Sequence, residues 1–369
     1  MEMPDPLHPR LPASRRPPAP RRPLALRLLL GALLLAALVA VLAASSTQAR
    51  VGAHAATTKD ARSAAAKKQA PRGPSYLTGI GDEQDEMFGN PLWRQLHTKI
   101  VRYIAPYDAA VRPYSLGKAV AWIHAAETQH QEILVAFYHS EYTKTKMPSV
   151  ATYSRDVMKF IRLFPHIRLY QAWDEDNRGY VSDGSASFAS PTAVQTAEYY
   201  RALKRDCQPC TVLGLDVLDA EQIGPTLTYI EEFKREIYRL KTLMPTVWGL
   251  HNYSDLNRLE SWRTRDLVKA LGGEVWLTET GGIVQFGGAF PNKHGSGLTR
   301  AAKVLQFMFK VAASEPRIKR LYIYDWTGGN SKTRFDAGLM NAHDQPRAGY
   351  VVVCRQLHAA HCDVKVAKN

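Results

Sequence analysis

Eight short runs of β-branched and aromatic residues alternate with longer amphipathic stretches from Tyr76 onward. Most of these runs are apolar throughout, which is typical of parallel strands buried on both faces. The runs span residues 76–81, 99–108, 132–140, 167–173, 211–219, 246–253, 274–280 and 320–326. The stretches between them show helical spacing of apolar residues, as in 149–164, 225–240 and 298–313.

Eight repeats of strand and helix predict the α/β class and a closed (β/α)8 TIM barrel over residues 76–369. The alternative is a doubly wound open sheet, which carries a Gly-rich phosphate turn after its first strand. The sequence GIGDEQDE at residues 79–86 does not supply that turn. We therefore expect one barrel domain, with its chemistry at the C-terminal ends of the strands.

The first 75 residues differ from the barrel in composition. Residues 1–23 are basic and rich in Pro and Arg, and residues 24–44 are almost wholly apolar. The apolar segment is long enough to span a bilayer, and its basic flank is expected to stay in the cytoplasm. Residues 45–75 have the composition of a flexible linker, or stalk. We expect a transmembrane anchor or a cleaved signal peptide, with the barrel outside the cell.

The formal net charge of +14 raises the question of nucleic-acid binding. Residues 1–75 account for +9 of this charge, which leaves only +5 for residues 76–369. No dense basic run recurs in the barrel, and the basic excess lies next to the apolar segment. We therefore expect a membrane contact through the N-terminal segment and no nucleic-acid partner.

Four cysteines in an extracellular protein favour two disulfides. The sequence neighbours are Cys207 with Cys210, and Cys354 with Cys362. The CQPC motif is similar to a thioredoxin-type redox motif, which follows a strand and opens a helix. Here it follows a helical stretch and precedes a strand, so we expect a structural disulfide.

Polar and aromatic side chains gather where the predicted strands end. These candidates are Arg102, His139, Trp173, Asp174, Glu175, Asp216, Asp219, His251, Tyr253, Glu279 and Trp326. Glu175 and Glu279 follow the fourth and seventh strands, so they should face each other across the barrel. Two opposed carboxyls are the groups that break a glycosidic bond. One protonates the leaving oxygen, and the other attacks the anomeric carbon or activates water.

The candidates around the two glutamates have roles that fit this chemistry. Trp173 and Trp326 would offer apolar faces to a sugar ring, and Tyr253 would hydrogen-bond the nucleophile. Arg102 would keep that nucleophile ionised at neutral pH. The sequence shows no His and Cys spacing typical of zinc, and we expect no metal and no cofactor.

This set of residues resembles the retaining (β/α)8 glycoside hydrolases of clan A. The resemblance covers about residues 76–360 and implies that Glu175 is the acid/base and Glu279, in LTETGG, the nucleophile. It also implies that Arg102, Trp173, Asp174, His251, Tyr253 and Trp326 contact the substrate or support the site. The chain is similar as well to a group of secreted actinobacterial proteins of this fold.

Asp174 departs from the pattern of that clan, where Trp-Asn-Glu-Pro ends the fourth strand. An Asn donates a hydrogen bond to a sugar hydroxyl, whereas an ionised Asp only accepts. The charge of Asp174 is also expected to raise the pKa of Glu175, and Asp176 is expected to be a solvated turn residue. The prediction is a monomeric glycosidase that cleaves an extracellular poly- or oligosaccharide. The alternative is a barrel that binds a cell-surface glycan without cleaving it.

Overall fold

The computed structural model describes residues 75–181, 188–330 and 333–367. The predicted basic segment 1–23, the apolar segment 24–44 and the linker up to residue 74 lie outside the described residues. No helix within the described ranges is both long and apolar enough to cross a membrane.

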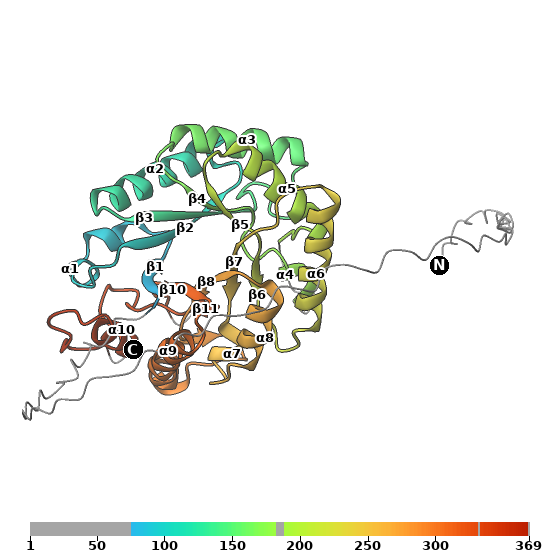
Figure 1. Ribbon diagram of the computed structural model, residues 1–369. Helices are drawn as coiled ribbons and strands as arrows, with labels where there is room; N and C mark the ends of the chain where they lie inside the picture. The colour runs from blue at the N-terminus through green and yellow to red at the C-terminus, as the bar shows by residue number, and fades with distance from the viewer. Residues whose placement is uncertain (1–74, 182–187, 331–332, 368–369) are drawn as a thin grey trace, which may run out of the picture. The chain divides into compact units, whose positions relative to one another are not determined.

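The described residues form a barrel of eight parallel strand positions surrounded by helices (Figure 1). The strands are β1 (Leu77–Gly81), β2 (Ile100–Pro106), β3 (Glu132–Tyr138), β4 (Leu169–Gln171), β5 (Thr211–Leu213), β6 (Asp216–Leu218), β7 (Val247–His251), β8 (Glu274–Thr280) and β10 (Ile318–Tyr324). The fifth predicted run forms two of these, β5 and β6. β5 pairs with β4 and β6 pairs with β7, so the fifth run joins the two ends of the sheet. The predicted (β/α)8 barrel is confirmed.

Helices lie outside the strands, where their apolar faces cover the barrel. The α-helices are α1 (Pro91–Arg94), α2 (Pro113–Thr128), α3 (Val150–Leu163), α4 (Arg178–Val181), α5 (Ala193–Asp206), α6 (Gly224–Arg239), α7 (Tyr253–Leu256), α8 (Trp262–Leu271), α9 (Ser296–Ser314) and α10 (Ala348–Gln356). The 3-10 helices are η1 (Asp85–Gly89), η2 (Ala109–Val111) and η3 (Lys293–Gly295). A short antiparallel pair, β9 (Gln285–Phe286) and β11 (Phe335–Asp336), links the loops after β8 and β10.

Local sequence explains where several helices begin. The Ser149 side chain accepts a hydrogen bond from the backbone N–H of Thr152 at the start of α3. Thr192 and Gln195 form a reciprocal capping box at the start of α5. Pro225 occupies the first turn of α6, where its missing N–H is not needed.

An apolar layer fills the interior of the barrel below the strand ends. Its buried members are Ile100, Leu134, Leu169, Leu213, Trp276 and Tyr322. Side chains alternate along a strand, so residues two positions further on point into the same interior. Those positions hold Arg102 in β2, Gln171 in β4, Gly249 in β7 and Thr278 in β8. The barrel interior is therefore apolar in one layer of side chains, and the next layer contains these polar residues.

β8 contains one extra residue relative to β7. Trp276 and Glu279 pair with Gly249 and His251 of β7, so three steps in β8 match two in β7. Against β10 the same extra residue lies between Leu277 and Thr280, and an opposite shift earlier in the pair compensates for it. A bulge of this kind redirects a side chain, and here it allows Thr278 and Glu279 both to reach the polar interior.

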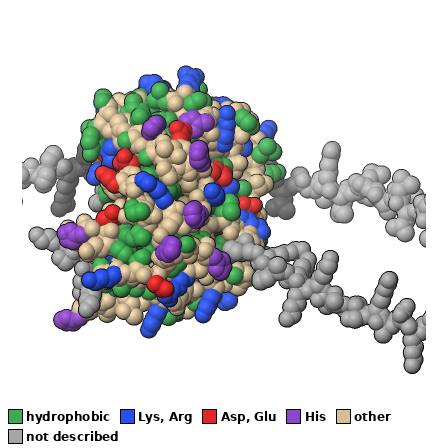
Figure 2. All heavy atoms as spheres, turned by 90° about the vertical axis from the view of Figure 1, so that its left-hand side faces the viewer, with side chains coloured by type: hydrophobic (Ala, Val, Ile, Leu, Met, Phe, Trp, Pro, Cys, Tyr) green, Lys and Arg blue, Asp and Glu red, His purple; other side chains and the backbone are tan. Residues whose placement is uncertain are grey.

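On the face in Figure 2, Lys and Arg side chains are mixed with Asp, Glu and His. No continuous patch of one charge is visible among the coloured residues of that face.

Both predicted cysteine pairs are confirmed. Cys207 bonds to Cys210 between α5 and β5, and Cys354 of α10 bonds to Cys362 in the C-terminal segment. The second bridge ties the segment after α10 to a cysteine that is fully buried in the core.

We expect the double substitution Cys354→Ala/Cys362→Ser to lower the free energy of unfolding by about 2–3 kcal/mol. The bridge closes a loop across a sequence separation of 8 residues, and a loop of this length restricts the unfolded chain by roughly that amount. Urea unfolding of both proteins under non-reducing conditions measures the change. An unchanged midpoint would show that the C-terminal segment contributes nothing to stability.

Candidate active site

Arg102 occupies the centre of the polar interior and is fully buried. Its guanidinium donates to Asp174 Oδ1 at 2.5 Å, Asp216 Oδ2 at 2.8 Å and Glu279 Oε1 at 2.8 Å. Its Nε donates to Gln171 Oε1 at 2.9 Å. Arg102 was expected at the end of its strand, but it is the third residue of the seven-residue β2. The long side chain lies inside the barrel and connects β2 with β4, β6 and β8.

Asp216 is the acid most deeply embedded in this cluster. It accepts from Arg102, from the Thr278 hydroxyl and from His251 Nε2 at 3.1 Å. Burial by itself would raise the pKa of Asp216, but His251 and Arg102 hold it below its ordinary value. A Cβ at Gly249 would lie 2.3 Å from Asp216 Oδ1, so the absence of a side chain there makes room for this carboxylate.

His251 bridges the carboxylates of three different strands and is fully buried. Its Nδ1 lies 3.4 Å from Glu175 Oε1 and 3.6 Å from Glu279 Oε2, while Nε2 faces Asp216. Burial opposes a charge on the ring, but Asp216 and Glu279 raise the pKa of His251 well above its ordinary value. An imidazolium with two N–H donors therefore orients the acids around it.

Glu175 and Glu279 converge from opposite sides of the barrel. A carboxylate oxygen of each, together with a ring nitrogen of His251, lies within 4.8 Å of the others. The residues are only 6% and 5% exposed, so their carboxyls are largely shielded from water. Glu175 has a positive φ of 47°, a backbone conformation that costs energy for a residue with a Cβ. The turn after β4 places its carboxyl over the barrel centre.

The protonation of Glu175 differs from the sequence-based expectation. Burial would raise its pKa, but Arg178 and His251 outweigh that effect and hold the pKa below its ordinary value. Arg178 is the first residue of α4, and its guanidinium contacts Glu175 Oε2 directly. The expectation that Asp174 raises the pKa of Glu175 was wrong, because the two cations contribute more than the neighbouring acid.

Asp174 has an unusual protonation state in this site. Burial raises the pKa of Asp174 to about 8, with Glu279 and Glu175 adding to the effect and Arg102 opposing it. The proton is bound below that pH and lost above it. A protonated Asp174 has an O–H and is a donor at neutral pH.

Asp176 was expected to be a solvated turn residue, and this was wrong. It is buried, its Oδ2 accepts from the backbone N–H of Asp216 at 2.9 Å, and burial raises its pKa well above the ordinary range. The next residue, Asn177, exchanges hydrogen bonds with both backbone groups of Leu218. These two side chains fasten the turn after β4 to β6. The four polar residues 174–177 therefore serve the site and the barrel rather than solvent.

Two tyrosines form the wall next to Glu279. The Tyr253 hydroxyl donates to Glu279 Oε2 and lies equally close to the backbone oxygen of Tyr324, at 3.4 Å in each case. The Tyr324 hydroxyl donates to Glu83 Oε2 at 2.8 Å. Glu279 is thus linked to a further acid, Glu83, at the end of β1.

The two tryptophans expected to stack on sugar are 1% exposed. Trp173 stacks on Tyr107 and Tyr199 in the aromatic core, at ring-centroid distances of 6.3 and 5.8 Å. Trp326 packs edge-on against Tyr350. Neither indole presents an open face, because each is packed among buried aromatic residues, including Tyr199 of α5 and Tyr350 of α10.

The donor set at the barrel centre does not suit a metal ion. Two groups have ligand atoms close enough for one: Asp174, Asp216 and His251, and Glu175, His251 and Glu279. The neighbouring acids raise the pKa of His251, which favours an imidazolium in both groups, and Arg102 already binds one oxygen of each of Asp174, Asp216 and Glu279. A divalent cation would add charge beside two fixed cations and would need neutral imidazole.

The fold can now be compared with solved structures. Native xylanase 10B from Thermotoga maritima matches with a TM-score of 0.55 and 14% identity, covering 77% of this chain and 95% of that one. A fungal β-1,4-galactanase structure gives 0.56 and 11%, covering 77% and 100%. The chain has the (β/α)8 fold of clan A glycoside hydrolases. At these identities the likeness shows the fold alone.

A family 39 glycoside hydrolase from Bacteroides cellulosilyticus WH2 matches with a TM-score of 0.50 and 13% identity, covering 77% of this chain and 64% of that one. No protein-family model and no curated protein sequence matches the chain. The similarity to secreted actinobacterial proteins therefore stays a prediction.

Several residues of the site were not singled out from the sequence. Gln171, Arg178, Thr278 and Glu83 carry no motif of their own. Side chains alternate between the interior and the exterior along a strand. Counting two residues on from the apolar interior position of each strand would have found Gln171 and Thr278, as it finds Arg102. Nothing in the sequence indicates that Arg178, three residues beyond Glu175, would turn back to contact it.

We expect Arg102→Met to lower the free energy of unfolding by about 3–5 kcal/mol, because Asp216 and Glu279 then lose their buried cation and Asp174 loses a hydrogen-bond donor. Arg112→Met is the matched control. Arg112 is 42% exposed in its side chain and pairs with Asp108, so its loss should cost far less than the loss of Arg102. Equal losses in denaturant unfolding would contradict a central role for Arg102.

We expect the Asp174 carboxyl to titrate near pH 8 in the folded protein. Carboxyl ¹³C chemical shifts followed from pH 4 to pH 10 measure this, and Asp174→Asn assigns the resonance by removing it. A resonance that titrates below pH 5 would show that Arg102 outweighs the burial of Asp174.

Proposed function

We propose that the barrel is a retaining glycoside hydrolase acting on a poly- or oligosaccharide, with Glu279 as nucleophile and Glu175 as acid/base. The observation that carries the proposal is the approach of these two carboxyls to within 4.8 Å of each other, measured between oxygens. Retaining enzymes hold their carboxyls about 5–5.5 Å apart, whereas inverting enzymes leave about 6.5–9.5 Å for a water.

Glu279 is prepared to attack an anomeric carbon. Arg102 binds its Oε1 at 2.8 Å, and the Tyr253 hydroxyl reaches its Oε2 at 3.4 Å. These donors stabilise the ionised carboxylate and hold it in one orientation. Attack forms a covalent glycosyl ester on Glu279, while Glu175 gives a proton to the departing glycosidic oxygen. Glu175 then takes a proton from water, which displaces Glu279 and releases the sugar.

Glu175 needs a proton for the first step, and its cationic neighbours oppose this. Arg178 contacts it from α4, and His251 lies on its other side. The pKa of a general acid rises when a nearby cation is removed. A sugar that takes over the Arg178 guanidinium as a hydrogen-bond donor would release Glu175 to hold the proton.

Asp174 takes the place of an Asn that donates to a sugar hydroxyl in the clan. Its carboxyl is protonated below about pH 8, so it supplies an O–H donor from the same position. The departure from the motif thus preserves the donor and changes its pH dependence. This proposal keeps Asp174 as a substrate-binding residue.

Binding without cleavage is the second candidate function. The buried indoles of Trp173 and Trp326 and the ion pair between Arg178 and Glu175 favour it, because they restrict access to the acid/base. We place the protein outside the cell, secreted or held by residues 24–44, on the composition of that segment.

The test is release of reducing sugar by the full chain from a broad polysaccharide panel, beside Glu279→Gln and Glu175→Gln. We expect Glu279→Gln to lose turnover by more than about 10³-fold while still binding the substrate, because only the nucleophile is lost. Glu231→Gln, an exposed acid on α6, is the control and should keep full activity.

Anomeric configuration is read by NMR in the first turnovers, and retention is the expected result. Binding with no turnover in any variant would favour the glycan-binding alternative. Turnover that survives Glu279→Gln would overturn the proposed mechanism.

A further inference from the structure

A cavity of about 530 Å³ lies beside the tyrosine wall of the site, between the ends of β1 and β10. Five of the residues that line it are acidic: Asp82, Glu83, Glu86, Asp325 and Asp344. No Lys or Arg lines it among the described residues. The rest of the barrel domain is mildly basic, so this concentration of acids is local.

These five acids lack counter-ions. None of them forms an ion pair with any described residue, unlike Asp174, Asp216 and Glu279 in the neighbouring site. Burial and the nearby Asp82 raise the pKa of Glu83 to about 8. Like charges gathered without a cation are unfavourable unless they hold protons or a cationic ligand.

Two of the acids that line the cavity have an oxygen without a hydrogen-bond partner. Glu83 Oε1 and Asp325 Oδ1 are buried and have no partner among the described residues. Buried polar groups in folded proteins are nearly always hydrogen-bonded. Both carboxyls therefore retain acceptor capacity, which a ligand with N–H or O–H groups satisfies once the carboxyls turn toward the cavity.

The ligand that fits is larger than a metal ion. The described residues form three-ligand clusters within 4.8 Å only around His251, and not among these five acids. The cavity volume also exceeds what one hydrated cation fills. A sugar residue supplies hydroxyls as donors and acceptors, and an ammonium group supplies the charge.

The cavity adjoins the reacting carboxylates. Tyr324 lines it and donates to Glu83, and its backbone oxygen lies 3.4 Å from the Tyr253 hydroxyl that contacts Glu279. A sugar in the cavity would therefore be a neighbour of the sugar whose bond is cleaved.

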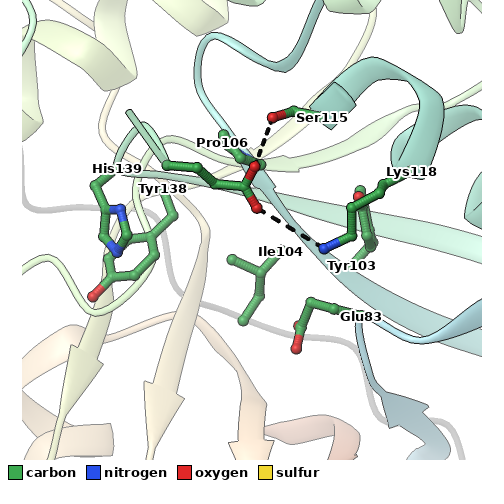
Figure 3. A pocket seen from close by; sticks show the side chains of 9 residues that line it. Glu83, Tyr103, Ile104, Pro106, Ser115, Lys118, Tyr138 and His139 are labelled. Carbon is green, nitrogen blue, oxygen red and sulfur yellow. Dashed lines mark hydrogen bonds and ion pairs between the residues drawn. The ribbon is translucent and has the colours of Figure 1, made fainter. Parts of the chain in front are cut away.

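Glu83 also lines a second, smaller cavity of about 130 Å³ on the side of β2 and β3. Figure 3 shows Glu83, Ile104, Lys118 and His139 around it. The one Lys here is already paired, because its Nζ lies 3.9 Å from Glu141 Oε1. Glu83 is thus shared by two adjoining cavities, and no Lys or Arg of the described residues forms an ion pair with it in either.

We propose that the cavity lined by Asp82, Glu83 and Asp325 is a subsite for a sugar that carries a free, protonated amino group. The inference rests on the proposed glycosidase function and names its substrate class as a glycan with unacetylated amino sugars. The ammonium lies against Glu83 and Asp325, and the sugar hydroxyls contact the other polar residues that line the cavity. An N-acetylated or neutral sugar leaves the acids without a cation.

The test is calorimetric binding to the full chain carrying Glu279→Gln, which prevents turnover. The probes are matched pairs of tetrasaccharides, fully deacetylated and fully N-acetylated, with glucosamine and with galactosamine units. We expect the deacetylated member of at least one pair to bind about tenfold or more tightly, and 0.5 M NaCl to weaken that binding.

Glu83→Gln/Asp325→Asn, added to the same background, removes the charge and keeps the shape. We expect it to abolish the preference for the amine without weakening the acetylated probe. Glu231→Gln, added to that background instead, should leave the preference intact. Equal binding within both pairs, or a preference that survives the double substitution, would overturn the inference.

The outcomes separate this inference from the proposed function. Cleavage of neutral glycans alone, with no preference for the amine, would leave the glycosidase standing and remove the subsite. Amine-dependent binding that requires Glu83 and Asp325, with no cleavage of any glycan by the unsubstituted chain, would support the subsite and overturn the glycosidase.

Discussion

The buried guanidinium of Arg102 is the interaction on which the site depends. It joins Asp174, Asp216 and Glu279, which come from three different strands, and its position in β2 is fixed by the barrel itself. One unneutralised carboxylate in such a place would cost several kcal/mol, so the cation is what allows acids to gather there. His251 adds a second cation above the first. The residues around these acids follow from this requirement. A small residue such as Gly249 leaves room for a carboxylate, and nearby hydroxyl groups donate hydrogen bonds to the acids.

The acids of the barrel top fall into two groups with different electrostatics. Around Arg102 and His251, carboxylates are paired, and Asp216 and Glu175 have lowered pKa values. Around Glu83 and Asp325, carboxylates are unpaired, and their pKa values are raised by burial. Tyr324 stands between the groups. The first arrangement suits chemistry on a neutral acetal, and the second suits recognition of a positive charge on the same ligand.

The strand-helix repeat was sufficient to predict the barrel, because continuous apolar runs of the right length have few other stable arrangements. It also placed Glu175 and Glu279 at strand ends, and the two cysteine pairs were evident from sequence proximity. The burial of Trp173, Trp326 and Asp176 was not predictable from it. Burial at a strand end depends on which loops fold over it, and those loops come from distant parts of the chain.

The sequence by itself determined the alternation of strands and helices and the residue types available for chemistry. Tertiary structure alone decided their charges and partners. The extra residue in β8 brings Glu279 toward Arg102, and the turn after β4 brings Arg178 back to Glu175. Asp174 holds its proton because burial and two neighbouring glutamates outweigh one guanidinium. These effects depend on how the folded backbone places atoms close together in space, and most of those atoms are far apart in sequence, so a linear pattern does not contain them.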